Sequence, residues 1–486
     1  MSFSIAKCKT KYGTQIRIVN HFQYKTKYIK TIGTSKDPLT LNMHLIQAQQ
    51  YIDNLENNFW AEPSFSLDLK NPADKINPTV LENFTPLKAI HSNAYNKIAK
   101  IFDVLFADID LPVLFKNLCI LRVIAPSSKR EAVNLLEELF NLRYSLDQIY
   151  YLKNTLPNLK AKIVNSVMTY AVGTLGVDFK LIFYDVTTLY FESFTEDDLK
   201  KCGFSKDNKF NQPQIVIGLL VDKSGFPLSY EIYEGNKFEG HTFIPTIKNY
   251  ITQFGIQNIT VVADAAMMSR MNFADLDEAN LKYIIGARVS NLSIKLITEI
   301  SKTLNSVPDK TYSVDYEGHL LVTHYSEIRA RKDNSDRQKQ LTKAQIILLE
   351  KKKSVVRTPK FIKKLSEDEY EINQALLEKA EKLEGIKGYH TNLDLPSIEI
   401  VKMYANLWKI EQNFRVAKTD LEIRPIYHWK EKGIKFHILL NYVALAISRL
   451  IEQKEGMSIK SYVKQIMRKQ EFFIRKLDTN EIFVIR

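Results

Sequence analysis

The stretch LIFYDVTTLYF, residues 181–191, is an apolar run that carries one carboxylate, Asp185, near its centre. Its β-branched and aromatic residues predict a buried strand. A charged side chain in such a strand costs free energy unless it is paired, hydrogen-bonded or bound to a metal. A second apolar run, VVADAA at residues 261–266, carries Asp264. These two aspartates are the first candidates for a functional site.

The segments around these runs predict the fold. The sequences QIVIGLLVD (214–222) and FPLSYEIYEGN (226–236) indicate two more strands, and HTFIPTIKNYITQFG (241–255) indicates a helix. A short helix (271–280) and a strand (281–288) come after the run that contains the second aspartate. This order is that of an RNase H-like domain, an α/β fold whose mixed sheet is flanked by helices. In that sheet the strands of the two aspartates are neighbours, so their carboxylates are expected to converge.

The segments N-terminal to this core have a different pattern of apolar and charged residues. Residues 1–36 read as short strands with charged faces, and residues 86–173 carry apolar residues at helical spacing. Ser128 stands three residues before Glu131, which predicts a helix N-cap at Ser128. This region is therefore expected to hold a β and helical module, compatible with a helix-turn-helix.

Composition restricts the partners. The chain has 486 residues, enough for roughly two to four domains, and a net charge of +13 with a pI near 9.2. Such a surplus favours a polyanion. The most apolar stretch, residues 438–447, is too short to span a bilayer and contains Asn441, and residues 1–13 lack the apolar run of a signal peptide. A nucleic acid is the expected partner, and a membrane is not.

Cysteine usage adds little. Cys8, Cys119 and Cys202 lie far apart and form no CxxC pair. The sequence therefore suggests neither a zinc site nor a disulfide framework.

The positive charge is concentrated in two blocks. Residues 1–36 hold eight basic residues and no acidic one, and residues 329–364 hold 13 basic residues against three acidic ones. Cationic surfaces of this kind neutralise phosphates. Arg329, Arg331 and Lys332 of the second block are predicted DNA contacts, although a solvated surface would also explain a charge run.

A third carboxylate is found on the helical stretch that begins near residue 397. Tyr404, Glu411 and Lys418 are spaced by seven, so one helical face presents a phenol, a carboxylate and an ammonium group. The alternative is an exposed helix on which Glu411 pairs with Arg415. Glu399 and Glu422 are rival carboxylates, but neither is centred in a Tyr/Lys row.

The blocks YDVTTLYF, VVADAAMMS and YANLWKIEQNFRVAK (404–418), followed by LEIRPIYHW, resemble the signature blocks of bacterial insertion-sequence DDE transposases of the IS-four-type group. That family has a Tyr-x2-Arg-x3-Glu-x6-Lys motif and a β-rich domain inserted before its glutamate. This chain matches at Tyr404, Glu411 and Lys418 but has Leu407 at the arginine position. Lys409 or Arg415 would then replace that phosphate contact.

The resemblance implies a metal-dependent transposase. Asp185, Asp264 and Glu411 would be the catalytic residues and the ligands of Mg²⁺ or Mn²⁺, in two ions, since hard cations prefer carboxylate oxygens. It also implies cutting at the ends of the element and joining of the freed 3′-hydroxyls to target DNA, by a homodimer on terminal inverted repeats in the bacterial cytoplasm at the nucleoid. The implied DNA contacts are Tyr404, Lys418, Arg415, Lys409, Arg424, Arg329, Arg331 and Lys332.

The expected domains follow from these segments. They are a basic arm with strands that contacts DNA (1–85), a helical module (86–176), the first part of the core (177–289), an inserted basic, β-rich domain (290–396), the second part of the core with the glutamate helix (397–450), and a helical tail (451–486).

Two other functions fit the same residues. One is an RNase H-like nuclease that cuts DNA without joining it, and the other is a domesticated DNA-binding protein without activity. The inserted basic domain and the Tyr/Glu/Lys row favour the transposase, and the three carboxylates argue against loss of activity. Trp408 and Trp429 could stack on an unpaired base, but Trp408 is expected in the core because it adjoins Leu407.

Overall fold

The computed structural model describes the protein in two compact units, residues 1–92 with 469–486 and residues 93–468. The residues that it describes are 2–485 without 23–24, 38–39, 42–43, 46, 49–51, 53–64, 68–83, 156–158, 193, 204–210, 238–239, 257–258, 269–272, 351–359, 366–369 and 477–481. Part of the second basic block, at 351–359, and the tyrosine at 24 in the first block thus lie outside the described residues.

The smaller unit contains two antiparallel or mixed sheets. The strands predicted within residues 1–36 are confirmed, and they pair in sequence order through a tight turn at Gly13. The second sheet has the order β4-β17-β16-β5, so strands near residues 65 and 85 share it with the last two strands of the chain. The prediction of a helical C-terminal tail is wrong in its last part, because the tail ends in two strands that pair with the strands near residues 65 and 85. The bounds are β1 Ser2–Thr10, β2 Gly13–Phe22, β3 Lys25–Ser35, β4 Phe65–Leu67, β5 Phe84–Ile90, β16 Glu471–Lys476 and β17 Ile482–Ile485.

Five helices open the larger unit. They are α3 Ser92–Leu105, α4 Val113–Ile124, α5 Lys129–Phe140, α6 Leu146–Thr155 and α7 Lys160–Gly173. The helical prediction is confirmed except at its start, where residues 86–90 belong to strand β5. The predicted N-cap is confirmed too, since the Ser128 hydroxyl accepts a hydrogen bond from the Glu131 amide at 3.1 Å.

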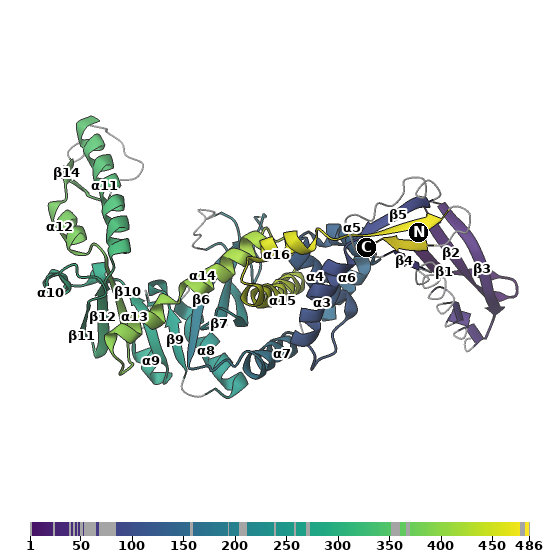
Figure 1. Cartoon of the computed structure of the whole chain (residues 1–486), viewed down its shortest axis with the longest axis horizontal. Coiled ribbons are helices and arrows are strands. Elements are labelled where there is room, and N and C mark those ends of the chain that lie inside the picture. The colour runs from purple at the N-terminus through teal and green to yellow at the C-terminus, as the bar shows by residue number, and fades with distance from the viewer. Residues whose placement is uncertain are drawn as a thin grey trace. The chain divides into compact units, whose positions relative to one another are not determined.

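The core is an eight-stranded mixed sheet with the order β11-β12-β15-β10-β9-β6-β7-β8 (Figure 1). Strand β6 runs parallel to β9, β9 runs parallel to β10, and β6, β7 and β8 form an antiparallel meander. The element order β6-β7-β8-α8-β9-α9-β10 confirms the predicted RNase H-like fold. The bounds are β6 Leu181–Tyr190, β7 Gln214–Asp222, β8 Pro227–Glu234, α8 Gly240–Phe254, β9 Thr260–Ala263, α9 Phe273–Glu278 and β10 Lys282–Ala287.

Helices cover both faces of this sheet. On one face the Tyr184 hydroxyl bonds to Thr242 of α8 at 2.7 Å. On the other face the Tyr442 hydroxyl of the long helix α15, Glu431–Glu455, donates to the Leu228 carbonyl of β8 at 2.8 Å. Side chains alternate along a strand, so Asp185, next to Tyr184, points to the face that α15 covers.

The segment between the two parts of the core contributes both strands and helices. Strands β11, β12 and β15 extend the core sheet, with β15 antiparallel to β10. The basic block is helical over most of its described length, since α11 includes 22 of its residues, 329–350. The bounds are α10 Ile294–Leu304, β11 Thr311–Tyr316, β12 His319–Tyr325, α11 Glu327–Glu350, β13 Ile362–Lys364, β14 Tyr370–Ile372, α12 Gln374–Lys382 and β15 Ile386–Thr391.

The C-terminal part of the larger unit is helical. It comprises α13 Ser397–Ala405, α14 Trp408–Arg415, the π-helical turn η4 Val416–Asp420, α15 and α16 Ile459–Ile466. Helix α15 is long and apolar enough to span a membrane, but 94% of its apolar window is buried inside the protein. It is therefore a buried helix of the core. It extends beyond the apolar stretch at residues 438–447 in both directions.

Candidate active site

The two aspartates lie at the same level of the sheet. Strands β6 and β9 pair in parallel with Tyr184 opposite Ala263; Asp185 is the next residue of β6, and Asp264 directly follows the last residue of β9. The register therefore brings both carboxylates to the same level of the sheet, and both act electrostatically on Tyr404 of α13. The expectation that these two strands are neighbours is confirmed.

The backbone holds both carboxylates close to the chain. Asp185 is half-buried and its Oδ1 accepts a hydrogen bond from the Val186 amide at 2.8 Å. Asp264 is exposed and its Oδ1 accepts one from the Ala265 amide, where the chain turns into a short 3-10 helix, η2 Ala265–Met268. A carboxylate has about four lone-pair sites, so one backbone hydrogen bond does not use its full capacity as an acceptor.

Tyr404, at the end of α13, packs into a gap beside Asp264. The centroid of its ring lies 4.3 Å from the centroid of the Tyr389 ring on β15. On β10, a Cβ atom added to Gly286 would lie 2.6 Å from the Tyr404 hydroxyl and 2.9 Å from the Ala265 amide nitrogen. Glycine is therefore required at this position if the phenol and the Asp264 turn are to keep their places.

The pKa of Tyr404 depends on burial and on the charges around the site. Burial raises the pKa of Tyr404 well above its ordinary value. The carboxylates of Asp264, Asp185 and Glu411 raise it further, because each disfavours a second negative charge nearby. The phenol therefore stays protonated and can donate a hydrogen bond beside all three acidic groups.

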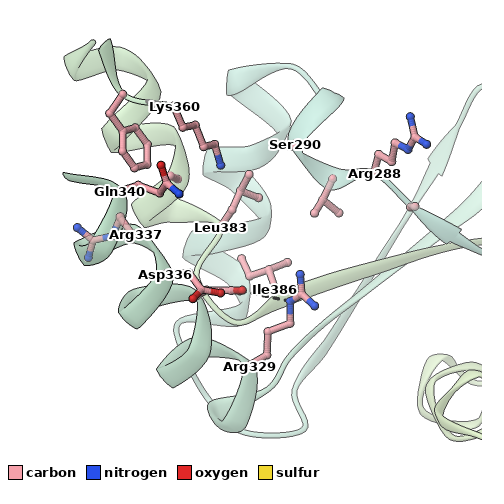
Figure 2. Close-up of a pocket in the computed structure, with 14 residues that line it drawn as sticks. Arg288, Ser290, Arg329, Asp336, Arg337, Gln340, Lys360, Leu383 and Ile386 are labelled. Carbon is pink, nitrogen blue, oxygen red and sulfur yellow. Dashed lines mark ion pairs between the residues drawn. The ribbon is translucent and has the colours of Figure 1, made fainter. Parts of the chain in front are cut away.

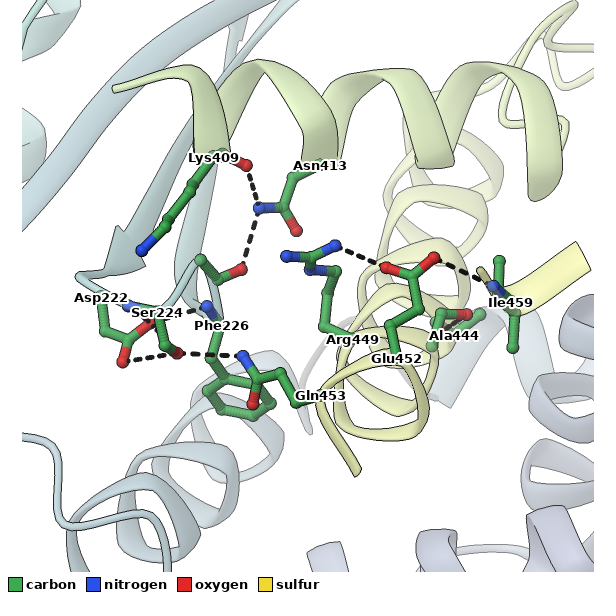
Figure 3. A network of polar contacts seen from close by, with 12 residues as sticks. Asp222, Ser224, Phe226, Lys409, Asn413, Ala444, Arg449, Glu452, Gln453 and Ile459 are labelled. Atoms are coloured by element: carbon green, nitrogen blue, oxygen red, sulfur yellow. Dashed lines mark hydrogen bonds and ion pairs between the residues drawn. The ribbon is translucent and has the colours of Figure 1, made fainter. Parts of the chain in front are cut away.

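The helix of Glu411 is fixed to the sheet by polar contacts (Figure 3). Asn413 donates from its amide nitrogen to the Gly225 carbonyl and to the Lys409 carbonyl, both at 2.9 Å. Lys409 donates to the Lys223 carbonyl at 2.7 Å. Asn413 is fully buried, whereas Glu411 is exposed on the same short helix. The anchor lies on one side of α14 and leaves the carboxylate on the other.

The same network continues into the core helices. Asp222 caps the turn between β7 and β8 by accepting from the Ser224 and Phe226 amides, at 3.0 and 2.6 Å. Arg449 of α15 pairs with Glu452 at 2.5 Å, and Glu452 accepts from the Ile459 amide at 2.9 Å. The position of α14 thus depends on the turn that it contacts and on α15 behind it.

Three carboxylates suit a hard cation such as Mg²⁺, which prefers oxygen ligands. Among the residues that the structure describes, no three acidic, histidine or cysteine side chains are close enough to hold one metal ion. Asp185, Asp264 and Glu411 instead share the surroundings of one phenol. Because like charges repel, such carboxylates close on a common point only around a cation. The three carboxylates suit a hard cation by their chemistry, while their described positions do not bring them to one point.

A cationic edge borders the site on the side of the inserted segment. Lys387 of β15 is half-buried and lies opposite His324 of β12. Burial lowers the pKa of Lys387, and Arg329 lowers it further, while Asp333 and then Glu411 raise it. Sequence reasoning missed this lysine, because nothing in the local pattern of residues 386–391 shows that the strand returns next to β10.

The phosphate contacts predicted on residues 404–418 have different surroundings in the structure. Lys418 is half-buried in η4 and lines a small apolar cavity with Thr187 of β6. Arg415 is exposed, whereas the Lys409 ammonium is used by a backbone carbonyl. Leu407 is 7% exposed, so the residue at the family's arginine position is part of the core. The continuous face predicted for residues 404–418 is divided over α13, α14 and η4.

The contacts predicted on the insert lie around the start of α11. Arg329 pairs with Asp333 at 3.3 Å and Arg331 pairs with Glu327 at 2.6 Å. Lys332 is exposed and acts electrostatically on Lys387. Arg329 and Lys332 thus adjoin the cationic edge of the site, and Arg331 is engaged at the helix N-terminus.

Two other predictions have different outcomes. Arg424 stacks over the Tyr190 ring at 5.6 Å, beyond the end of β6, and is not part of the carboxylate cluster. The expectation that Trp408 belongs to the core is wrong, because its side chain is 54% exposed. One turn of helix α14 therefore presents an aromatic ring and Glu411 to solvent.

A larger cavity, of about 580 Å³, lies between β10, α11 and α12 (Figure 2). Arg288, Arg329, Arg337 and Lys360 contribute its positive charge. Its most enclosed cation is already neutralised, since Arg337 bonds Glu384 at 2.6 Å and Glu381 at 2.9 Å.

The comparisons with known proteins agree with this core. The family model for the transposase DDE domain matches residues 178–447, more than half of the chain. The chain belongs to the transposase DDE domain family. No curated protein matches it.

Solved transposase structures show only a distant likeness. The cryo-EM structure of the piggyBac transposase synaptic complex with hairpin DNA has a TM-score of 0.40 and 11% identity, over 78% of this chain and 75% of that one. The Mos1 transposase paired-end complex with the left transposon end has a TM-score of 0.16 and 10% identity, over 35% of this chain and 56% of that one. At these values neither likeness bears on the function.

Proposed function

We propose that this DDE-family protein is an insertion-sequence transposase that cuts DNA at the ends of its element and joins the freed 3′-hydroxyls to target DNA. The observation that supports it is the placement of Asp185 on β6 and of Asp264 directly after the parallel neighbour β9, each one residue past the pair Tyr184 and Ala263, with Glu411 acting on the same phenol. The Asp185, Asp264 and Glu411 carboxylates are assigned as the catalytic groups and as the ligands of divalent metal. Two Mg²⁺ or Mn²⁺ ions bound there would activate the attacking oxygen and stabilise the leaving oxygen.

The reaction breaks one bond and forms one bond in each step. In the first, a water oxygen forms a bond to phosphorus and the bond to the 3′-oxygen breaks, leaving a 3′-hydroxyl that takes up the proton. In the second, that 3′-hydroxyl attacks a target phosphodiester and releases a new 3′-hydroxyl. Neither step needs an oxidant or a nucleotide cofactor.

Side chains around the carboxylates bind and orient the DNA in this proposal. Tyr404, held protonated, donates a hydrogen bond to a phosphate oxygen next to the scissile bond. Lys418, Arg415 and Lys387 supply positive charge to flanking phosphates. The remaining predicted contacts, Lys409, Arg424, Arg329, Arg331 and Lys332, are assigned to DNA further from the reacting phosphate.

The partners follow from the chemistry. The DNA substrate is the pair of terminal repeats and the target, and two ends must be held together, so a homodimer on DNA is proposed. The place of action is then the bacterial nucleoid, in the cytoplasm. We assign residues 1–85 as the basic arm that contacts DNA and residues 290–396 as the basic segment inserted into the core. Residues 177–289 and 397–450 are the two parts of the core that carry the assigned carboxylates.

A cleavage and joining assay tests the proposal. Labelled duplex DNA that carries the element's own ends is incubated with Mg²⁺ or Mn²⁺ and with wild type, Asp185→Asn, Asp264→Asn or Glu411→Gln. We expect metal-dependent nicking and joining by wild type, a loss of at least about a thousandfold in each variant, and retained DNA binding.

Other outcomes identify the alternatives. Nicking without joining indicates a nuclease, and binding without nicking by wild type indicates a DNA-binding protein that has lost its activity. Nicking that survives Glu411→Gln shows that the third ligand is a different residue. Glu399→Gln, an exposed carboxylate at the start of α13, is the matched control and is expected to nick normally.

A further inference from the structure

Another cavity, of about 350 Å³, has none of the three carboxylates in its lining. The N-terminus of α5, the segment after η4 and helix α15 form its wall, so elements from two distant parts of the sequence meet there. We call it the α5 cavity. Its charged lining is Arg122, Lys129, Arg130 and Arg424 against the single carboxylate of Glu422.

Two of these cations are buried. Lys129 is 7% exposed and Arg122 is 5% exposed. Arg122 donates to the Ser127 carbonyl at 2.6 Å. Among the described residues no carboxylate pairs with Lys129, and its ammonium lies 5.6 Å from the centre of the Phe436 ring. A buried cation without a counter-charge is costly, and an anion in the adjacent cavity would offset that cost.

The backbone at this place also favours an anion. Helix α5 has 12 residues, and its N-cap Ser128 satisfies the Glu131 amide. The first amides of an α-helix have no carbonyl partner within the helix, and the helix dipole makes this end positive. Lys129 and Arg130 occupy the first turn, where cations are ordinarily disfavoured. Their positions are explained if a negative ligand binds in front of the helix.

The neighbouring groups feel the same positive field. Burial lowers the pKa of Lys129 well below its ordinary value and Arg122 lowers it further, so an anion bound in the cavity would favour the protonated ammonium. Burial followed by the charge of Lys129 lowers the pKa of His428 to about 4. His437 responds in the same direction and to the same causes. These imidazoles are neutral near pH 7 and add no charge of their own to the cavity.

We propose that the α5 cavity binds a phosphate group and that, in the complex with DNA, this group is a backbone phosphate. The DNA assignment rests on the proposed function. The cavity lies beyond the end of β6, since Ile426 bridges to Phe191 and Arg424 covers Tyr190. Six residues of strand separate Phe191 from Asp185, about 20 Å at 3.3 Å per residue. Measured along the axis of B-DNA, at 3.4 Å per phosphate of one strand, that distance corresponds to about six phosphates.

The first test uses inorganic phosphate as the probe. Thermal unfolding of the full chain is followed in phosphate and in chloride at equal ionic strength. We expect phosphate to raise the Tm of wild type and to have no specific effect on Lys129→Met. In chloride, Lys129→Met is expected to melt above wild type because a buried unpaired cation has been removed. A lysine with only a structural role would give the opposite shift.

The second test uses duplex DNA over a range of salt concentrations. We expect the slope of log K against log salt to be shallower by about one for Lys129→Met, as for the loss of one phosphate contact. Arg130→Gln, at an exposed position, should weaken both phosphate and duplex binding even if Lys129→Met fails to fold. Lys248→Met is the matched control, since it removes an exposed lysine from α8 on the opposite face of the sheet.

A methylphosphonate scan of the duplex then locates the contact. Neutralising one phosphate, about six nucleotides from the cut, should weaken binding of wild type about tenfold and leave Lys129→Met unaffected.

The outcomes separate the two proposals. A phosphate-dependent rise in Tm that persists in both Lys129→Met and Arg130→Gln overturns the cavity as a phosphate site. A rise lost in these variants, with unchanged salt slopes, overturns the DNA assignment and indicates free phosphate as the ligand. If wild type does not bind duplex DNA, the proposed function and the DNA assignment both fail, whereas the Tm measurement still decides whether the cavity binds phosphate.

Discussion

Replacing Gly286 with alanine should disable the site without adding or removing a charge. The new Cβ would lie 2.6 Å from the Tyr404 hydroxyl oxygen and 2.9 Å from the Ala265 amide nitrogen. Non-bonded contacts of carbon ordinarily lie at about 3.5–4.0 Å, so the gaps fall short by at least about 0.9 and 0.6 Å. Ala265 follows Asp264 directly and donates its amide to that carboxylate. A movement of Ala265 therefore displaces Asp264.

The expected magnitudes follow from this geometry. Tyr404 has little room to retreat, because its ring packs on Tyr389 at 4.3 Å. Overpacking of this degree costs about 1–3 kcal/mol of unfolding free energy. A catalytic group displaced by about 1 Å lowers the rate about a hundredfold. We expect Gly286→Ala to fold, to bind duplex DNA with wild-type affinity and to nick it about a hundredfold more slowly.

The assay is single-turnover nicking in Mg²⁺ together with urea unfolding. Gly173→Ala is the matched control, because an added Cβ there meets no atom within 4 Å, and wild-type nicking is expected. In the double variant with Tyr404→Phe the nearest clash is removed, so part of the lost stability should return while nicking stays low. Wild-type nicking by Gly286→Ala would refute the reasoning that this glycine fixes Tyr404 and Asp264.

Three further predictions concern other parts of the larger unit. Asn413→Ala removes the buried anchor of the Glu411 helix, so unfolding free energy should fall by about 1–3 kcal/mol in urea titrations and nicking should fall with it. Lys387→Met removes one cation from the edge of the site and should lower nicking about 10- to 100-fold, measured at saturating metal, with stability kept or raised. Burial and then the charge of His319 lower the pKa of His390 to about 4 from 6.5. The unfolded chain therefore binds a proton that the folded protein does not between pH 6.5 and 4, and stability falls as the pH is lowered through this window. Wild type should lose roughly 2–3 kcal/mol more than His390→Gln between pH 7 and pH 4.5, and equal losses would contradict the assignment.

Short-range patterns in the sequence predicted most of the core elements. The strands that carry Asp185 and Asp264, the helix between them and the N-cap at Ser128 all depend on residues a few positions apart. Hydrophobic periodicity and capping act over the same short range, so they are visible in a single sequence. The order of these elements then indicated which strands are neighbours, because few sheet topologies accommodate it.

Strands that pair with distant segments of the chain were harder to predict from the sequence. Residues 86–90 of strand β5 were read as helix and the C-terminal strands were read as a helical tail, since β5 and β16 pair across hundreds of residues of sequence. The exposure of Trp408 was misjudged for a related reason. Its helix is only two turns long, and the side that faces the core is set by Asn413 and Ile410 rather than by the adjoining leucine.

By itself, then, the sequence determined the fold class, the two strand aspartates and the concentration of positive charge. The tertiary structure decided what surrounds them. It brings β15 beside β10, so that Tyr389 and Lys387 reach a site whose aspartates are more than a hundred residues earlier. It also joins residues 122–130 to residues 422–437 around the α5 cavity. The physical reason is that side-chain pattern specifies an element locally, whereas the surroundings of a charge depend on which elements pack against it, and those contacts are non-local.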